Sequence, residues 1–208
     1  MLFIDILGLI GTAAFAVSGV LVGIKSRLDL FGVFVLAVFT ASGGGLLRDI
    51  ILKKGMPVLF TDSRYLITIF LSTVLACSLF RFLTKIHLFI QVFDALGLGV
   101  FTVLAAFECI SLKVPLIGII FISVLTGIGG GIIRDILVNN VPMVFKSEIY
   151  ALASIIGAFA FYFLYKNIDL AVSMYVCILL VFAVRITAVY FNLNLPVLSP
   201  DAPRQDTL

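Results

Sequence analysis

Residues 40–50 read Thr-Ala-Ser-Gly-Gly-Gly-Leu-Leu-Arg-Asp-Ile, and residues 126–136 read Thr-Gly-Ile-Gly-Gly-Gly-Ile-Ile-Arg-Asp-Ile. Both stretches lie inside long apolar runs. Each glycine in a helix interior costs about 1 kcal/mol relative to alanine, so three in succession predict a break or a kink. An arginine and an aspartate then stand side by side where charge is costly to bury. One chain therefore carries the same unusual block twice.

The two blocks belong to a longer internal repeat. At a shift of 86 residues, which is the separation of positions 40 and 126, the copies align without a gap from Gly8 to Lys54. With one residue of adjustment, Pro57 and Phe60 align with Pro142 and Phe145. Matches at this density indicate a duplication.

The composition is that of a membrane protein. Of the 208 residues, 62% are hydrophobic and only 12% are charged, and the mean hydropathy is +1.28. A soluble domain has about a quarter of its residues charged. Apolar runs of about 20 residues recur along the whole chain, which is typical of a polytopic helical membrane protein.

The predicted fold is all-α, with seven transmembrane helices as an inverted repeat of three plus three, followed by one more. The expected spans lie at about residues 4–24, 30–52, 65–83, 91–110, 115–138, 149–165 and 170–191. Because each unit has an odd number of spans, the second must enter the membrane from the opposite side. The predicted division is 1–87 for the first repeat, 88–166 for the second, 167–192 for the seventh helix and 193–208 for a mobile tail, within one membrane domain.

Other charges lie within or near the expected spans. Asp5 and Asp94 are expected near the first turns of their helices, where an acid suits the helix dipole. That structural role is assigned to both. Glu108 is expected at the membrane interface. Arg185 either snorkels toward the interface, which is the favoured interpretation, or is a buried charge.

The arginines and aspartates of the repeated block are the functional candidates. Neighbouring residues on a helix point about 100° apart, so Arg48 is not expected to pair with Asp49. The predicted two-fold relation offers another arrangement, in which Arg48 pairs with Asp135 and Arg134 pairs with Asp49. Ionisable residues inside a membrane are candidates for function by default.

The glycine triplets predict a hydrated path. A helix that stops at a triplet would present carbonyl oxygens, which suit a cation. Non-helical backbone at membrane depth is tolerated only where protein surrounds it or it lines a water-filled cavity. Under the alternative, the glycines only let two spans cross closely, while the charges cap helices or reach the interface. If the path exists, leucine at Gly44 or Gly130 should abolish transport and leave assembly largely intact.

The doubled block, the proline after each copy and the order of spans resemble the prokaryotic trimeric intracellular cation (TRIC) channels. The resemblance covers nearly the whole chain up to Asn192, with Asn139-Asn140 in place of Lys53-Lys54 as the one departure. The same superfamily includes small bacterial proteins named as glycine transporters. The resemblance implies a homotrimer with one pore in each protomer, lined by the second and fifth spans. It also implies a monovalent cation, chiefly potassium, as the permeant ion.

The site residues follow from this resemblance, position by position. The implied hinge residues of the pore are Gly43, Gly44, Gly45, Gly129, Gly130 and Gly131. The implied gating charges are Arg48, Asp49, Arg134 and Asp135, and the nearby polar lining residues are Thr40, Ser42 and Thr126.

The leading functional prediction is a potassium-permeable channel, and the alternative is a secondary transporter of a small amino acid such as glycine. A membrane scaffold without transport is a third possibility. An enzyme is not expected, because no nucleophile–base set, metal cluster or phosphate loop is present, and no cofactor or nucleic acid is expected. Besides potassium in transit, a bound lipid remains open. The expected location is the bacterial inner membrane, with the N-terminus outside and the C-terminus in the cytoplasm, from a slight excess of basic residues.

Overall fold

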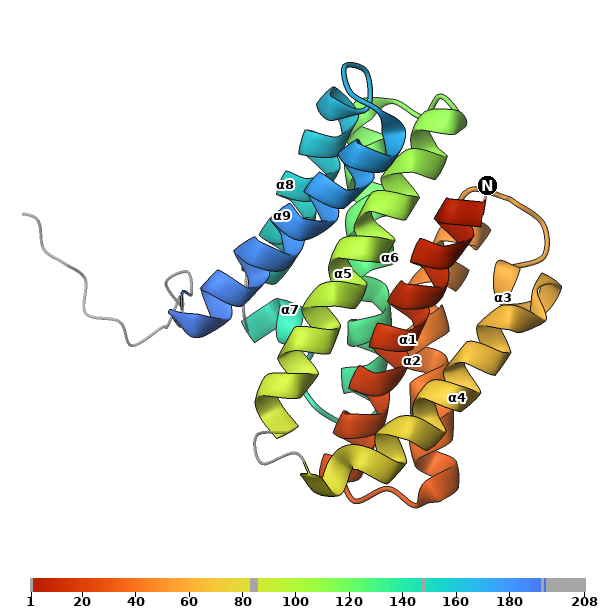
Figure 1. Cartoon of the computed structure of the whole chain (residues 1–208), viewed down its shortest axis with the longest axis vertical. Helices are drawn as coiled ribbons and strands as arrows, with labels where there is room; N and C mark the ends of the chain where they lie inside the picture. Colours follow the sequence, from red (N-terminus) through yellow and green to blue (C-terminus); the bar gives the residue numbers. More distant parts are fainter. Residues whose placement is uncertain (1, 83–85, 147–148, 192, 194–208) are drawn as a thin grey trace, which may run out of the picture.

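A computed structural model describes residues 2–82, 86–146, 149–191 and 193. The protein is an all-helical membrane protein, as its composition predicts (Figure 1). The described residues form α1 (Leu2–Lys25), α2 (Leu30–Ile51), α3 (Val58–Thr61), α4 (Ser63–Leu79), α5 (Ile86–Ser111), α6 (Leu116–Leu137), α7 (Met143–Lys146), α8 (Ile149–Leu164) and α9 (Leu170–Tyr190), with a 3-10 turn at Phe80–Phe82. The predicted mobile tail lies outside the described residues, except for Leu193.

Five helices in the described part of the chain, α1, α2, α5, α6 and α9, are long and apolar enough to cross a membrane. The apolar helices α4 and α8 have 17 and 16 residues. At 1.5 Å per residue they extend about 24–26 Å, which is less than the roughly 30 Å of hydrocarbon in a bilayer. Seven helices therefore match the predicted positions, and five of them reach spanning length.

The helix order repeats along the chain. The series α1, α2, α3 and α4 is followed by α5, α6, α7 and α8, and α9 has no counterpart. The two short helices, α3 and α7, begin just after Pro57 and Pro142, and the sequence analysis did not anticipate them. Four residues are too few to show helical periodicity, so the apolar pattern does not predict these helices.

The long helices end in the same way in both halves. Among the described residues, positive φ outside glycine occurs at Arg27 (59°), Lys53 (52°), Lys113 (57°) and Asn139 (56°). Each follows a helix C-terminus, where a left-handed residue lets the chain turn back on the last helical carbonyls. Thus Lys54 N donates to Asp49 O at 3.1 Å, and Asn140 N donates to Asp135 O at 2.8 Å. Asparagine tolerates this conformation better than lysine, so the turn is preserved where Asn139 replaces the lysine of the first half.

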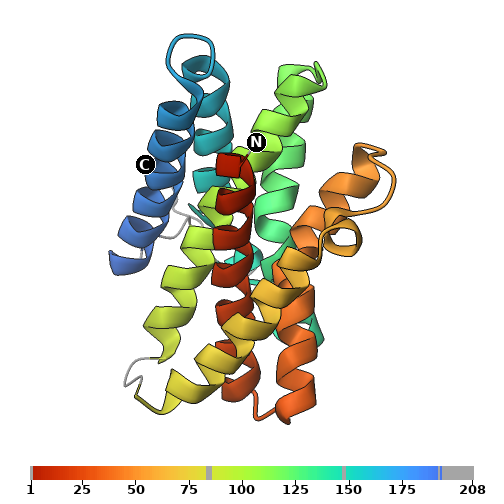
Figure 2. The same cartoon turned by 45° about the vertical axis from the view of Figure 1, so that its right-hand side comes forward.

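The core is formed where the two halves meet. Helix α1 packs against α5, and α2 packs against α6. In Figures 1 and 2, α1 and α5 run in opposite directions, as do α2 and α6. The repeat-equivalent Phe15 and Phe101 stack at this junction, with their ring centroids 5.4 Å apart and their planes 8° apart. Helices α8 and α9 cover α5 on one side, and α4 covers α1 on the other.

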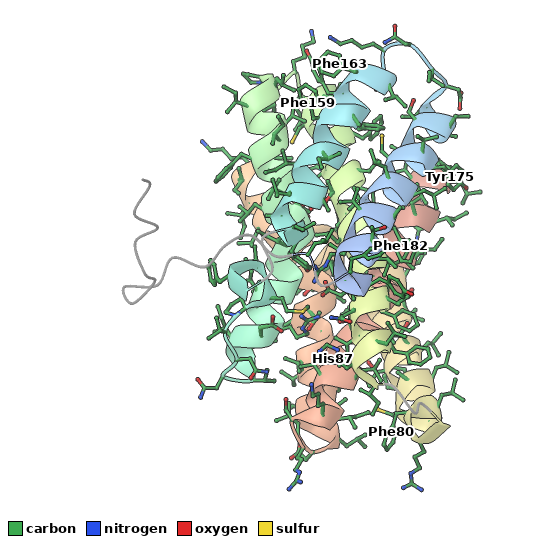
Figure 3. All side chains as sticks on the ribbon, turned by 90° about the vertical axis from the view of Figure 1, so that its left-hand side faces the viewer. Phe80, His87, Phe159, Phe163, Tyr175 and Phe182 are labelled. Atoms are coloured by element: carbon green, nitrogen blue, oxygen red, sulfur yellow. The ribbon has the colours of Figure 1, made fainter. Side chains whose placement is uncertain are left out.

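The outer surface is apolar, as expected for a protein in lipid. Aromatic side chains such as Phe159, Phe163 and Tyr175 stand on the outer side of α8 and α9 (Figure 3). They are about half exposed, at 47%, 48% and 51%. In water such a surface would cause aggregation, whereas in a membrane it contacts acyl chains or another protein.

The glycine triplets do not break their helices. Helix α2 continues from Leu30 to Ile51 and α6 from Leu116 to Leu137, both as α-helix. The expectation of half-helices with free carbonyl ends is therefore wrong for this conformation. The reason is close packing, which offsets the low helix propensity of glycine.

Candidate functional site: two cavities and two buried ion clusters

The centre of the molecule is a close crossing of α2 and α6. A Cβ atom on Gly44 would lie far inside contact distance of the Thr126 carbonyl oxygen, and one on Gly130 would do the same to Thr40. Because positions 44 and 40 are equivalent to 130 and 126, each half makes the same contact on the other. Only glycine fits such a backbone approach.

The other glycines of the triplets have different surroundings. A Cβ on Gly43 would meet Ile133 at 2.6 Å, and one on Gly129 would meet Leu47 at 2.9 Å. A Cβ on Gly45 would meet no atom within 4 Å. Within one triplet, therefore, Gly44 fits a tight contact while Gly45 borders open space.

The three predicted polar lining residues fall in two kinds of place. The Thr40 and Thr126 hydroxyls donate to carbonyls of their own helices, at Leu36 and Ile122, both at 2.6 Å, and both side chains are buried at the crossing. Ser42 lines a cavity.

The arginines pair with the aspartates beside them. Arg48 Nη2 donates to Asp49 Oδ1 at 2.7 Å, and Arg134 Nε donates to Asp135 Oδ1 at 2.9 Å. The predicted pairing across the two halves is therefore wrong. A guanidinium on a long flexible stem can turn back to a neighbouring carboxylate although the two Cβ atoms diverge.

Each aspartate of the block also holds a short helix in place. Asp49 Oδ2 accepts a hydrogen bond from Val58 N at 3.1 Å, and Asp135 Oδ2 accepts one from Met143 N at 2.9 Å. These amides open α3 and α7, where a carboxylate satisfies a free N–H and suits the helix dipole. The Asp of the motif thus connects its arginine to the short helix that follows.

The first cavity opens at the end of the bundle that carries the start of α1. Its volume is about 150 Å3. The polar residues that line it are Asp5, Thr12, Ser42, Arg48, Asp49, Tyr65 and Glu108. Among the described residues, the buried Thr12 hydroxyl has no hydrogen-bond partner. A buried hydroxyl without a partner is costly, so this cavity suits water or a polar ligand.

Glu108 lines this cavity and lies in the last turn of α5. Its side chain is 23% exposed and lies 2.9 Å from Arg48 and 3.0 Å from Lys54. Arg48 therefore has two acidic partners, one buried and one in contact with the cavity.

The second cavity lies at the opposite end, where α1 ends and α5 begins. Its volume is about 460 Å3. Its polar lining residues are Lys25, Ser26, His87, Arg134, Asp135 and Asn140. The two cavities thus approach the α2–α6 crossing from opposite ends, and each reaches one Arg–Asp pair.

Arg134 is held in a buried network that could not be predicted from the sequence. Its Nη1 donates to Asp94 and to Ser18, both at 2.6 Å. Arg134 and Asp94 are each only 1% exposed as side chains. Asp94 is therefore not a first-turn residue, because α5 begins two turns earlier, at Ile86.

Arg185 does not snorkel. It is 2% exposed, and its guanidinium lies 4.7 Å from the centroid of the Tyr150 ring. The Tyr150 hydroxyl in turn lies beside Gly131, whose Cβ would approach it to 2.8 Å. Five helices therefore meet at one charged cluster. In the sequence, these residues stand out only as charges within apolar runs. Such a charge indicates a buried partner but does not show which residue that partner is.

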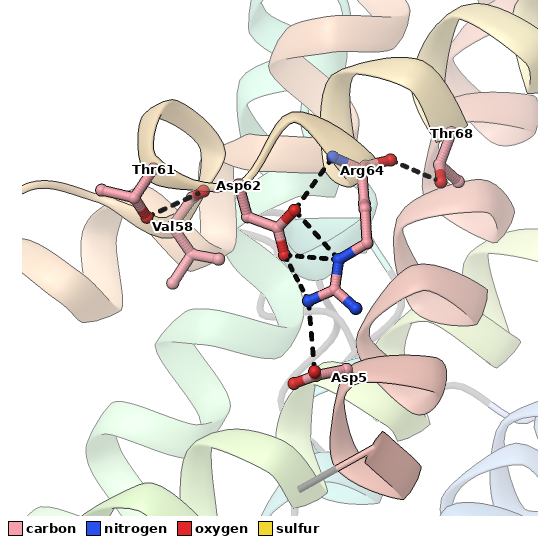
Figure 4. Close-up of polar contacts among 6 residues, drawn as sticks. All are labelled: Asp5, Val58, Thr61, Asp62, Arg64 and Thr68. Carbon is pink, nitrogen blue, oxygen red and sulfur yellow. Dashed lines mark hydrogen bonds and ion pairs between the residues drawn. The ribbon is translucent and has the colours of Figure 1, made fainter.

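A third ion cluster lies at the rim of the first cavity (Figure 4). Arg64, at the start of α4, donates to Asp62 at 2.6 Å and to Asp5 at 3.1 Å. Asp5 does lie in the first turn of α1, as predicted. The cluster ties α1 to α4, and its groups are partly exposed, which weakens each contact.

This rim cluster gives a pH-dependence prediction. Side-chain hydrogen bonds from Arg64 hold the pKa of the Asp62 carboxyl below its ordinary 3.8. A lowered folded pKa means that the contact stabilises the fold above that ordinary value and is lost as the pH falls through the folded pKa. We expect Arg64→Gln to return the Asp62 pKa toward 3.8 in a carboxyl NMR titration in micelles. An unmoved Asp62 pKa in the variant would contradict the assignment.

Comparison with known proteins defines the family. A family model described as "Glycine transporter" matches residues 5–81 and 91–166, one match in each half. The chain belongs to this family. The chain is similar to the UPF0126 inner membrane protein YadS of Escherichia coli K12, with 38% identity over 201 residues, which cover 94% of this chain and 96% of YadS. A UPF0126 membrane protein of Deinococcus radiodurans is 40% identical over 160 residues, 76% of this chain and 74% of that protein.

Solved structures relate the family to the TRIC channels. A prokaryotic TRIC channel crystallised in 0.5 M KCl matches with a TM-score of 0.88 and 35% identity over 93% of this chain and 99% of that one. A TRIC orthologue from Rhodobacter sphaeroides matches with a TM-score of 0.84 and 26% identity, over 93% and 100%. The predicted TRIC relation is therefore confirmed, and the chain has the TRIC channel fold.

Proposed function

We propose that this protein is a potassium-permeable cation channel with a pore inside each protomer. The path would lead from the first cavity, past the crossing of α2 and α6, to the second. The observation that carries the proposal is the placement of two cavities at opposite ends of the bundle, each reaching an equivalent Arg–Asp pair. The tight glycine crossing between them makes the present conformation a closed one.

The lining of the first cavity favours cations. Three of its four charged side chains, Asp5, Asp49 and Glu108, are carboxylates. Their other basic partners, Lys54 and Arg64, are not among the lining residues. A cleft with acidic walls raises the local concentration of cations.

Opening requires α2 and α6 to separate or bend at the triplets. Glycine interrupts neither helix here, but it lowers the cost of bending because it stabilises a helix less than any residue except proline. We infer that Gly43 to Gly45 and Gly129 to Gly131 act as hinges, with Arg48, Asp49, Arg134 and Asp135 as the charges that respond. Hydroxyls of Thr40, Ser42 and Thr126 would then face the opened path.

We further propose seven membrane helices in an inverted three-plus-three arrangement, plus one. Opposite helix directions in the two halves support this, as do the reciprocal contacts of Gly44 and Gly130. Such reciprocity is what a two-fold axis produces. The short helices α4 and α8 would span by local thinning of the bilayer.

The proposed setting is a homotrimer in the bacterial inner membrane, with the N-terminus outside and the C-terminus in the cytoplasm. The R. sphaeroides relative is a trimeric intracellular cation channel orthologue, and YadS is an inner membrane protein. The orientation rests on a slight excess of basic residues in the sequence. Six are expected on the cytoplasmic side (Lys25, Arg27, Arg81, Lys85, Lys146 and Arg204) and five on the other (Lys53, Lys54, Arg64, Lys113 and Lys166). Outward aromatic residues of α8 and α9 provide surface for a partner subunit or for lipid.

A second candidate is transport of a small amino acid such as glycine. The first cavity places a guanidinium, at Arg48, beside carboxylates, at Asp5 and Glu108, and this pair of charges suits a zwitterion. Glycine uptake that saturates, competes with unlabelled glycine and requires an ion gradient would favour this candidate.

The deciding experiment is a recording from purified protein in a planar bilayer, with potassium on one side and sodium on the other. A channel should show discrete openings and a reversal potential that reports cation selectivity. Slow, saturable flux without discrete openings would contradict the proposal. The matched control is the same preparation after heat unfolding.

A further inference from the structure

We infer that Asp94 is the positioning residue that holds the second half of the path closed, by keeping Arg134 inside the bundle. This inference rests on the proposed channel function. It starts from a difference between two otherwise equivalent halves.

The repeat shows that the fold itself does not need an acid at this place. At the shift of 86 residues, Asp94 is equivalent to Gly8. Tyr150 is equivalent to Tyr65 at a shift of 85, the one-residue adjustment that also aligns the prolines. In the first half the Tyr65 hydroxyl lies directly over Gly8, and both residues line the first cavity. In the second half Asp94 replaces Gly8, and the Tyr150 hydroxyl lies beside Gly131, whereas the equivalent Gly45 of the first half has no atom within 4 Å of its Cβ position.

The two arginines are consequently held in different ways. Arg48 pairs with Glu108, which is 23% exposed and lines a cavity. Arg134 pairs with Asp94, and both side chains are 1% exposed. A buried pair is screened much less than a partly exposed one, so the restraint on Arg134 is the stronger of the two.

The position of Arg134 makes this restraint relevant to the path. Arg134 is one turn beyond the triplet on α6 and lines the second cavity, together with Asp135. Asp94 is not among the residues that line that cavity, so its attraction draws the guanidinium inward, whereas Asp135 draws it outward. A Cβ on Gly131 would have Asp94 Oδ1 at 3.5 Å, which places the carboxylate beside the triplet itself.

The network also contains an incomplete part. Among the described residues, Asp94 Oδ2 and the Tyr150 hydroxyl are buried and neither makes a well-aligned hydrogen bond, although the hydroxyl lies against the Asp94 carboxylate. Buried polar groups that are poorly satisfied raise the free energy of a state. They therefore reduce the free-energy difference between this closed conformation and an open one. Loss of the charge on Asp94 would leave Arg134 with Asp135 and the water of the second cavity.

The test compares single-channel records of Asp94→Asn and Glu108→Gln in planar bilayers. We expect Asp94→Asn to raise the open probability about tenfold or more, which is the scale of one hydrogen bond between charged groups. Unit conductance should stay unchanged, because Asp94 does not line the cavities. Asp94→Glu, which keeps the charge, should restore closing. Glu108→Gln should change the open probability by a much smaller factor.

An open probability of Asp94→Asn within about twofold of wild type would overturn the inference, as would an equal effect of Glu108→Gln. If Asp94→Asn does not assemble, Ser18→Ala takes its place, since it removes the other partner of Arg134 Nη1 without changing charge. It should raise the open probability several-fold, and no change would overturn the inference. Absence of cation currents in the wild-type protein would instead contradict the proposed function.

Discussion

Alanine at Gly44 or at Gly130 should destabilise the protein by about 3 kcal/mol, the upper end of the usual cost of overpacking. The added Cβ would meet a carbonyl oxygen of the facing helix, at Thr126 or at Thr40. A backbone oxygen cannot rotate away, so α2 and α6 would have to move apart. The loss should appear as a lower free energy of unfolding when SDS is added to mixed micelles and helicity is followed by circular dichroism.

Gly45→Ala is the matched control within the same triplet. Its Cβ would meet no atom within 4 Å, and alanine favours helix over glycine by about 1 kcal/mol, so stability should rise slightly. Equal effects at Gly44 and Gly45 would mean that glycine serves helix bending alone and not the crossing. From the sequence, leucine at Gly44 was expected to abolish transport and leave assembly largely intact. The close contact of Gly44 with Thr126 means that leucine there should also disturb assembly.

Arg134→Gln should cost about 3–5 kcal/mol of stability, the scale for breaking a buried ion pair by removing one partner. It would leave Asp94 and Asp135 without their cation, in a site where the arginine is 1% exposed. The same SDS titration measures the loss. The double variant Arg134→Gln with Asp94→Asn should recover much of it, because it removes the uncompensated charge as well as its partner.

Arg48→Gln is the repeat-equivalent comparison. Its partner Glu108 is 23% exposed and has Lys54 at 3.0 Å, so water and lysine compensate for the missing guanidinium. We expect a loss of about 1–3 kcal/mol, smaller than at Arg134, because only Asp49 of its two acidic partners is buried. A larger loss at Arg48 than at Arg134 would contradict the assignment of the buried network to the second half.

The sequence by itself determined the helices and the duplication. A span of apolar residues must be helical in a membrane because its backbone groups have no other partners, so the positions of the long helices could be read from composition. Two copies of one block, at residues 40–50 and 126–136, showed that the two halves carry equivalent parts. The TRIC relation could be recognised from the same block.

Only the tertiary structure decided what each residue of the block contacts. Glycine at 44 and glycine at 45 look identical in sequence, yet one faces a carbonyl and the other faces a cavity. Arg48 and Arg134 likewise look equivalent, yet the first meets Glu108 and the second meets Asp94. These differences come from side chains far apart in the chain, because pairing across helices depends on how the helices cross. Periodicity within a helix fixes which residues share its face, but not which residues of another helix that face meets.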